Sequence, residues 1–255
     1  MSKDMMRAFE LYQPDSVENA VELLGRFGPE GWALAGGNDT LDWFKDRAKY
    51  ANAVVDLSGI EALRGIRETG DGVEIGAMTT LTEIESSELI QSRYSVLSDA
   101  ARRVASPQIR NTGTIGGNLC QDTRCWYYRY GTDCYRAGGT TCYADTPEGQ
   151  NREHCLWGAD RCVAVSPSDT APALVVLDAR MVVQNAEGER EIPAEEFFIG
   201  PDVDIEPKMD TLSIDPEPGV SKVTCGNGTI LKDNLCVANE MSFYFFINQF
   251  MRLFG

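Results

Sequence analysis

This 255-residue sequence has a single histidine, His154. A histidine pair or a histidine-rich metal site within the chain is therefore excluded, and a surface position is the default expectation for His154. Basic residues are also few: 23 lysines and arginines stand against 39 aspartates and glutamates, which leaves a net charge of −16. Nucleic-acid phosphates require a positive surface, so this balance argues against a nucleic-acid partner and fits a protein that meets other proteins or small ligands.

Long hydrophobic runs are missing too. No stretch reaches the roughly 18 apolar residues of a membrane helix, so we expect no membrane span. The first 16 residues lack a continuous apolar core and a small-residue cleavage site, and we expect no secretory signal there. These features predict a cytoplasmic protein whose cysteines stay reduced, because structural disulfides are rare in that compartment.

Two common phosphate-binding motifs are absent, although two glycine turns are present. The turns are the first glycine loop, residues 35–41, and the second glycine loop, residues 114–118. Neither is a G-x-G-x-x-G fingerprint or a P-loop with its lysine, which disfavours the usual nicotinamide and nucleoside triphosphatase sites. Glycine lets backbone N–H groups approach a phosphate, and successive N–H groups near a helix start can neutralise a pyrophosphate. The pair of loops therefore suggests a phosphate-bearing ligand.

The cysteines are concentrated in one stretch, residues 119–162, which we call the cysteine segment. Disulfides would require an oxidising compartment, and structural zinc usually uses paired C-x-x-C units, which the segment lacks. An iron–sulfur cluster also uses four thiolates but tolerates wider spacing. Spacing alone does not choose four ligands from the six candidates, which are Cys120, Cys125, Cys134, Cys142, Cys155 and Cys162.

Apolar periodicity and turn residues predict a mixed helix and strand architecture. A helix over residues 14–28 capped by Ser16, strands at 32–35 and 53–57, and a helix from about 41 to 50 form a compact βαβ-like unit. Two hairpins are predicted, with turns at 69–72 and 185–188. Further helical patterns lie at 81–84 and 96–104, the second ending at Ser106-Pro107, and regular structure is expected again at 163–165 and 173–177. The phenylalanine-rich stretch 241–254 predicts a helix that packs on the core or on a partner, or else an atypical terminus.

The two glycine loops resemble the FAD-binding loops of the medium, flavoprotein subunits of molybdenum hydroxylases. That family includes xanthine dehydrogenase, carbon monoxide dehydrogenase and 4-hydroxybenzoyl-CoA reductase. Residues 118–125, together with 168–174, resemble more specifically the branch whose flavin subunit carries an inserted [4Fe–4S] loop: the 4-hydroxybenzoyl-CoA reductase β subunit and certain bacterial aldehyde oxidoreductases. The resemblance covers roughly residues 8–200.

This resemblance implies an α+β protein with an FAD-binding type-2 (PCMH-like) fold of two α/β subdomains, an inserted cysteine-rich loop and an incomplete third domain. The expected divisions are an N-terminal FAD-binding subdomain at 1–58 and a second FAD-binding subdomain at 59–179, with the iron–sulfur insertion at about 119–162. A partial or atypical C-terminal domain would follow at 180–255, where Cys225 and Cys236 have no counterpart in the family pattern.

The resemblance also implies which residues hold the cofactors. The two glycine loops would hold the FAD pyrophosphate, and Asp169 matches a position that contacts the sugar portion of the nucleotide. The implied FAD-binding residues are Ala35, Gly36, Gly37, Asn38, Asp39, Thr40, Leu41, Thr114, Gly116, Gly117, Asn118 and Asp169. The implied ligands of the [4Fe–4S] cluster are Cys125, Cys134, Cys142 and Cys162, whereas Cys120 and Cys155 lie outside the pattern.

An oxidoreductase subunit follows from this resemblance. A large partner subunit with a molybdenum cofactor would transform the organic substrate, a small partner with [2Fe–2S] clusters would relay electrons, and this chain would exchange them with an external carrier through FAD. The protein positions and tunes cofactors in such a scheme, so no general base or nucleophile is expected. The alternative is a cysteine-stapled, zinc-binding scaffold subunit without flavin.

Overall fold

The computed structural model describes residues 6–70, 72–201, 229–232, 235–238 and 250–254. The first structural unit is a three-stranded parallel sheet with the order β1-β3-β2. Its strands are β1 (Glu10–Tyr12), β2 (Gly31–Leu34) and β3 (Ala53–Asp56). β2 and β3 confirm the predicted strands. β1 was not predicted, because it has only three residues and lies at an edge of the sheet.

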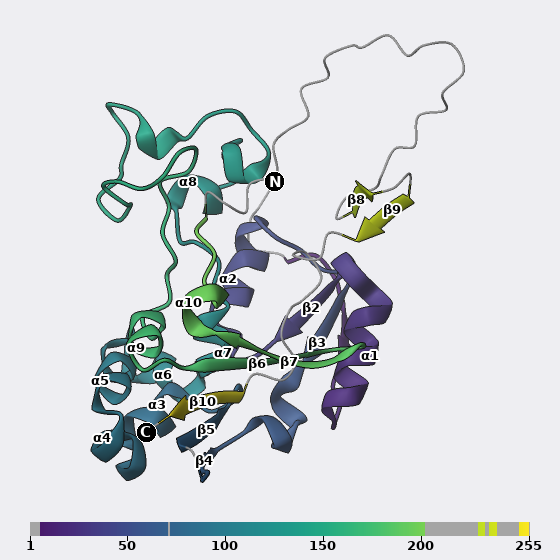
Figure 1. Ribbon diagram of the computed structural model, residues 1–255. Coiled ribbons are helices and arrows are strands. Elements are labelled where there is room, and N and C mark those ends of the chain that lie inside the picture. Colours follow the sequence, from purple (N-terminus) through teal and green to yellow (C-terminus); the bar gives the residue numbers. More distant parts are fainter. Residues whose placement is uncertain (1–5, 71, 202–228, 233–234, 239–249, 255) are drawn as a thin grey trace.

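Two helices cover the two faces of this sheet, because successive residues of a strand point to opposite sides. Val55 of β3 packs with the face of helix α1 (Val17–Phe27), and Val54 packs with Trp43 of helix α2 (Asn38–Asp46). The predicted cap of α1 is confirmed, since the Ser16 hydroxyl accepts a hydrogen bond from the Asn19 N–H at 3.3 Å. This layering directs the start of α2 to the carboxyl end of β2 (Figure 1).

The second unit is an antiparallel sheet with the order β4-β5-β10-β6-β7. Its strands are β4 (Ile66–Glu68), β5 (Gly72–Gly76), β6 (Arg180–Asn185), β7 (Gly188–Pro193) and β10 (Phe250–Phe254). Both predicted hairpins are confirmed, as β4–β5 and β6–β7. A separate two-stranded hairpin is formed by β8 (Thr229–Lys232) and β9 (Leu235–Ala238).

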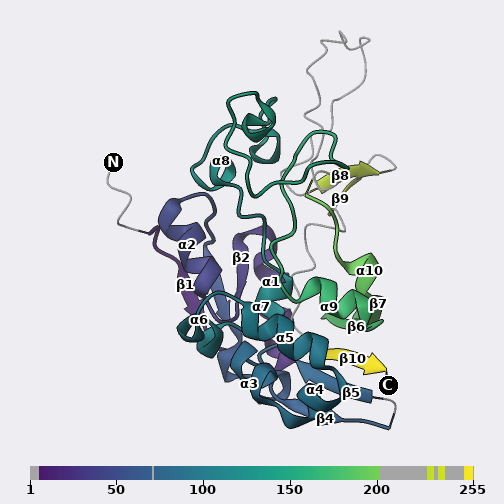
Figure 2. The same cartoon turned by 90° about the vertical axis from the view of Figure 1, so that its left-hand side faces the viewer.

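Short helices pack on this second sheet and bury its largest hydrophobic core. Val73 and Ile75 of β5 meet Leu97, Ile115 and Leu174 from three different helices. The helices gather beside the sheet in Figures 1 and 2. They are α3 (Leu81–Ser86), α4 (Glu88–Arg93), α5 (Ser95–Arg103), α7 (Ile115–Leu119), α9 (Ala171–Val176) and α10 (Ala194–Phe197), while α6 (Pro107–Thr112) packs beside α3 without contributing to this core.

Two local predictions were wrong and one helix was missed. The predicted helix at 96–104 does end before Ser106, but Ser106 and Pro107 also begin the unpredicted helix α6: the Ser106 hydroxyl accepts from the Ile109 N–H at 3.4 Å, and proline is favoured at a first helical position. Residues 163–165 have no regular structure. The predicted C-terminal helix is replaced over Phe250–Phe254 by strand β10, which pairs with β5 and β6, while residues 241–249 lie outside the described part.

The cysteine segment leaves the two sheets as a lobe of its own (Figures 1 and 2). Its regular structure consists of helix α8 (Trp126–Arg129) and two single 3₁₀ turns, Tyr135–Ala137 and Tyr143–Asp145. The buried apolar cluster within the lobe is small, with Cys162 and Ala164 at its centre. The lobe therefore depends on interactions other than a hydrophobic core. In the described parts of the chain, no helix combines the length and apolar character needed to cross a bilayer.

Candidate functional site

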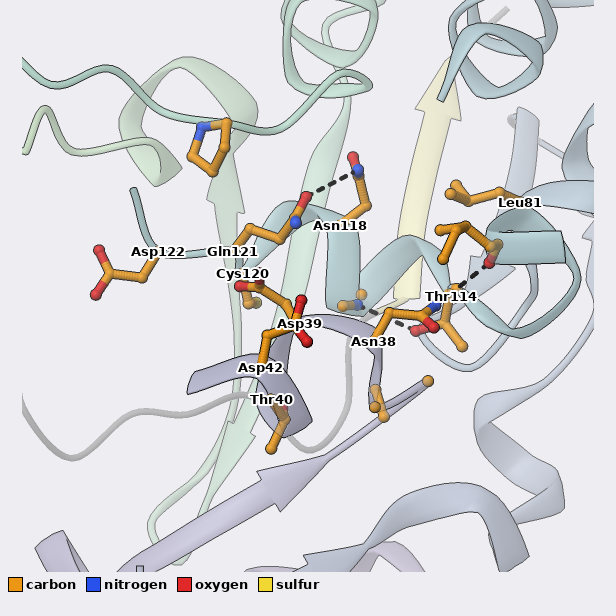
Figure 3. A pocket seen from close by; sticks show the side chains of 18 of the residues that line it. Asn38, Asp39, Thr40, Asp42, Leu81, Thr114, Asn118, Cys120, Gln121 and Asp122 are labelled. Atoms are coloured by element: carbon orange, nitrogen blue, oxygen red, sulfur yellow. Dashed lines mark hydrogen bonds between the residues drawn. The ribbon is translucent and has the colours of Figure 1, made fainter. Parts of the chain in front are cut away.

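The two glycine loops meet at a cavity of about 460 Å³, which we call the loop pocket (Figure 3). The first loop enters between β2 and α2, and the second lies between α6 and the middle of α7. The structure brings together at this pocket every FAD-binding residue named from the sequence except Leu41, together with Lys49, Cys120, Gln121 and Asp122. Leu41 does not line the pocket, and 39% of its surface is exposed.

Gly36 explains how the two loops come so close. A Cβ atom at this position would lie 2.2 Å from the carbonyl oxygen of Thr112, a distance that side-chain atoms do not adopt. The Asn38 amide adds a direct link, because it donates to the Ile109 carbonyl at 3.3 Å and to the Thr112 hydroxyl at 3.1 Å. The missing side chain of Gly36 therefore lets the first loop approach Thr112 and Gly113, the two residues that lead directly into the second loop.

The first loop offers backbone donors to the pocket. Gly37 caps α2 in a left-handed conformation, with φ of 78°, which glycine adopts without strain. The first N–H groups of a helix have no partner within the helix, and the helix dipole adds positive potential there. The residues that follow Gly37, namely Asn38, Asp39 and Thr40, all line the pocket. This end of α2 can therefore bind an anionic group.

The second loop differs, because its amides already have partners within the chain. The Gly116 N–H donates to the Ala77 carbonyl at 2.9 Å, the Gly117 N–H to the Thr114 hydroxyl at 3.1 Å, and the Asn118 N–H to the Thr114 carbonyl at 2.9 Å. The first bond ties the loop to the segment that follows β5, and the other two hold the loop in its own shape. The second loop therefore shapes the pocket, and the donors available to a pyrophosphate lie mainly on the first.

Asn118 connects the second loop to the predicted sugar-contacting residue. Its side-chain oxygen accepts from the hydroxyl groups of Ser168 at 2.9 Å and Thr170 at 2.7 Å. Its side-chain nitrogen donates to the Asp169 carboxylate and to the Gln121 amide oxygen, each at 3.2 Å. With only 6% of its surface exposed, Asn118 is a buried hub that holds Asp169 at the pocket wall.

Asp39, although part of the first loop, directs its carboxylate to the cysteine segment. It accepts a hydrogen bond from the Trp43 indole at 2.8 Å and pairs with the guanidinium of Arg129. Arg124 approaches the same carboxylate at 3.7 Å. Sequence reasoning placed Asp39 in the loop but missed these partners.

Asp122 occupies a second ion-pair group at the pocket wall. It pairs with Lys49 on one side and with Arg136, at 2.7 Å, on the other. Burial raises the pKa of Asp122, but the two cations and the hydrogen bond from the Thr123 N–H outweigh burial and bring that pKa below its usual value. Asp122 is therefore ionised at neutral pH.

The four cysteines implied as cluster ligands line a second, smaller cavity, which we call the cysteine cavity. Its volume is about 10 Å³, close to the space of a single water molecule. Among the described residues, no three cysteine, histidine, aspartate or glutamate side chains are arranged so that they could share a metal ion. The cavity gathers Cys125, Cys134, Cys142 and Cys162, whereas Cys120 lines the loop pocket and Cys155 lines neither.

Three of these cysteines stand directly before a short helical turn. Cys125 precedes α8, Cys134 precedes Tyr135–Ala137, and Cys142 precedes Tyr143–Asp145. Burial raises the pKa of the Cys125 thiol, and neighbouring thiols raise it further, although the backbone N–H groups of residues 127 and 128 act in the opposite direction. Neighbouring thiols ionise together only when a cation balances the negative charge of their thiolates.

His154 was expected at the surface, and in the structure the residue is half-buried, with its ring nitrogens enclosed. Its ring lines the cysteine cavity, and both ring nitrogens are buried without a hydrogen-bond partner in the described part of the chain. Burial lowers the pKa of His154, so that the ring is neutral at neutral pH and carries one N–H donor. No motif around His154 in the sequence indicated this position.

A comparison with protein-family models matches residues 7–214 to the family described as "FAD binding domain in molybdopterin dehydrogenase". The carbon monoxide dehydrogenase medium chain of Hydrogenophaga pseudoflava is 33% identical over 193 residues, which are 75% of this chain and 52% of that relative. The aldehyde oxidoreductase FAD-binding subunit PaoB of Escherichia coli is 34% identical over 201 residues, 77% of this chain and 62% of the relative.

A solved structure of carbon monoxide dehydrogenase from Hydrogenophaga pseudoflava superimposes with a TM-score of 0.58 at 31% identity, covering 77% of this chain and 54% of that chain. The chain thus spans about half to three fifths of the length of these relatives. The mixed helix and strand fold predicted from the sequence is confirmed.

Proposed function

Because the chain belongs to the family of FAD-binding domains of molybdopterin dehydrogenases, we propose that it is the FAD-carrying electron-transfer subunit of a molybdenum-dependent dehydrogenase or hydroxylase complex. The observation that carries this proposal is the loop pocket of about 460 Å³ between the two glycine loops. When bound, FAD supplies reversible electron chemistry, and the protein supplies binding and orientation.

The residues of the pocket have distinct roles in this proposal. The start of α2, with Gly37 as its cap, supplies N–H donors and helix dipole to the pyrophosphate. Gly36 keeps the two loops in contact, and Gly117 leaves the floor of the pocket open. Asp169, held by Asn118, accepts hydrogen bonds from sugar hydroxyls. Leu41, which does not line the pocket, supports the first loop, because its side chain lies beside Gly37.

We further propose that the cysteine cavity holds a [4Fe–4S] cluster on Cys125, Cys134, Cys142 and Cys162. The donor set fits, because four thiols gather at one place and backbone N–H groups face two of the sulfurs, those of Cys125 and Cys162. The unpartnered ring of His154 also fits, because a sulfur in the cavity would accept its N–H. The small cavity requires the thiols to move apart when the cluster is inserted.

The partner subunits proposed for this chain are inferred from the names of its relatives. Their names describe medium chains and FAD-binding subunits, so we propose a large subunit with a molybdenum cofactor, a small subunit with [2Fe–2S] clusters and an external electron carrier as partners. We propose a cytoplasmic location and the division into residues 1–58, 59–179 and 180–255. The branch exemplified by 4-hydroxybenzoyl-CoA reductase stays a prediction.

The visible spectrum of the purified, anaerobically loaded chain tests both cofactors. We expect flavin bands and a broad iron–sulfur shoulder, with FAD, iron and acid-labile sulfide in stoichiometric amounts. A colourless protein with stoichiometric zinc would instead identify the scaffold alternative.

A matched pair of valine variants tests the pocket itself. At Gly117 a Cβ atom would already lie 3.1 Å from the Thr114 hydroxyl oxygen, so Gly117→Val should obstruct the pocket and lower FAD content several-fold. Gly25→Val, at an open helix position with no atom within 4 Å, is the control and should retain FAD. Equal FAD content in both variants would exclude this pocket as the flavin site.

A further inference from the structure

Two carboxylates at the wall of the loop pocket bind cations of the cysteine segment. Figure 3 shows Asp39 and Asp122 at this wall. Asp39 lies at the start of α2, and Asp122 lies where the chain enters the cysteine segment. Each carboxylate has at least one arginine partner from the body of the segment, which is the part that surrounds the cysteine cavity.

The Asp39 group is largely buried. The side chains of Asp39 and Arg129 are only 18% and 13% exposed. The Arg129 guanidinium also lies 4.4 Å from the centre of the Trp43 ring, and Trp43 in turn donates its indole N–H to Asp39. Arg129 is part of α8, so this group fixes α8 onto α2.

The Asp122 group joins three parts of the chain. Lys49 comes from the loop between α2 and β3, Asp122 from the segment entry, and Arg136 from the turn that follows Cys134. Arg136 also lines the cysteine cavity and donates to the Pro201 carbonyl at 3.0 Å. The hydrogen-bonded pair of Asp122 and Arg136 is therefore a wall shared by the loop pocket and the cysteine cavity.

We infer that Asp39 and Asp122 are positioning residues whose carboxylates hold the cysteine segment against the loop pocket, and that neither carboxylate is a flavin ligand. A free carboxylate beside a pyrophosphate would repel it, whereas here cations satisfy both charges. The segment has little apolar core of its own, so these ion pairs set the placement of its cysteines. The inference deepens the proposed function, because it concerns the contact between the two proposed cofactor sites.

Thiol accessibility in the full chain, freed of metal by a chelator, tests this inference. Cys134 and Cys162 are each 7% exposed, so N-ethylmaleimide reaches them only when the segment opens. The rate of alkylation of both cysteines is measured by mass spectrometry. We expect this rate to rise about tenfold in Asp39→Asn and in Asp122→Asn, because each variant leaves a partly buried ion pair without one partner. Arg129→Gln and Arg136→Gln remove one arginine from each group and leave Arg124 and Lys49 as remaining partners, so they should accelerate alkylation in the same direction but by less.

Asp99→Asn is the matched control, because it removes an aspartate whose ion pair with Arg102 is exposed on α5. Its alkylation rates should equal those of the wild type. Unchanged rates in the Asp39 and Asp122 variants, or equal acceleration in Asp99→Asn, would overturn the inference. The proposed function has an independent test in the FAD and iron content of the loaded wild type, so the two failures are distinguishable.

Discussion

Substitution of Gly36 by alanine should weaken both the fold and the loop pocket, because the added methyl group has no space. Its Cβ would lie 2.2 Å from the Thr112 carbonyl oxygen and 3.1 Å from the Gly113 Cα atom. Since non-bonded atoms prefer a separation of about 3.5 Å, the two loops would have to move apart by about 1.3 Å. The obstacle is backbone, which cannot rotate away as the end of a flexible side chain can.

The expected cost follows from this geometry. Overpacking against a fixed neighbour costs about 1–3 kcal/mol. Separation of the loops also stretches the two hydrogen bonds of Asn38, which adds about 1 kcal/mol. The free energy of unfolding should therefore fall by about 2–4 kcal/mol, and with a urea dependence of about 2–3 kcal/mol per molar the midpoint should fall by about 1 M.

Gly25→Ala is the matched control, with the opposite expected sign. Gly25 lies inside α1 with no atom within 4 Å of a new Cβ, so alanine should stabilise the helix by about 0.5–1 kcal/mol. Urea unfolding followed by tryptophan fluorescence, together with FAD content from absorbance, measures both variants. A Gly36→Ala protein as stable as the wild type, with full FAD content, would refute the close contact of the two loops.

Three further predictions concern the cysteine segment. Cys134→Ser should remove the iron of the loaded protein, whereas Cys155→Ser, outside the cysteine cavity, should retain it; equal iron loss would contradict the ligand assignment. His154→Phe should keep iron but lower the reduction potential of the cluster, because an N–H···S bond is lost. His154→Gln retains an N–H donor, so its potential should stay near that of the wild type; an EPR-monitored redox titration measures both. Because Lys49 and Arg136 hold the pKa of Asp122 below its usual value, its stabilisation is present above about pH 4 and disappears as the pH falls through the depressed value. The stability difference between wild type and Asp122→Asn should therefore be constant from about pH 7 to pH 5 and shrink in more acid urea titrations; a difference that shrinks toward neutral pH would contradict this assignment.

Local signals in the sequence were sufficient for most of the fold. Helix α1 could be predicted because Ser16 caps it and apolar residues recur on one face. Both hairpins could be predicted because glycine-containing turns separate two short stretches in each. Helix α6 was missed because Pro107, taken as a terminator, is the first residue of a new helix. Strand β10 depends on partners about 70 and 175 residues away in the chain, and no local pattern encodes such a pairing.

The candidate site, like the fold, contains some features that could be predicted from the sequence and others that could not. The glycine loops could be recognised because a tight turn needs particular residues at consecutive positions, and the structure places the two loops at one pocket. The ion-pair partners of Asp39 and Asp122 could not be recognised from the sequence, because Arg129 is 90 residues from Asp39 and Lys49 is 73 residues from Asp122. His154 was assigned to the surface because a lone histidine carries no pattern, and only the folded chain directs its ring to the thiols.

Asn118 has a consequence for how such a chain can change over evolutionary time. Its side-chain amide donates to Gln121, where the chain enters the cysteine segment, and accepts from Ser168 and Thr170, where the chain has returned from it. The two ends of the cysteine segment are therefore held side by side. A stretch anchored at two adjacent points can be lengthened, exchanged or deleted with little entropic penalty and little strain on its host. The cysteine segment is thus attached to the fold at two neighbouring points, and natural selection or a protein engineer can exchange it without rebuilding the fold beneath it.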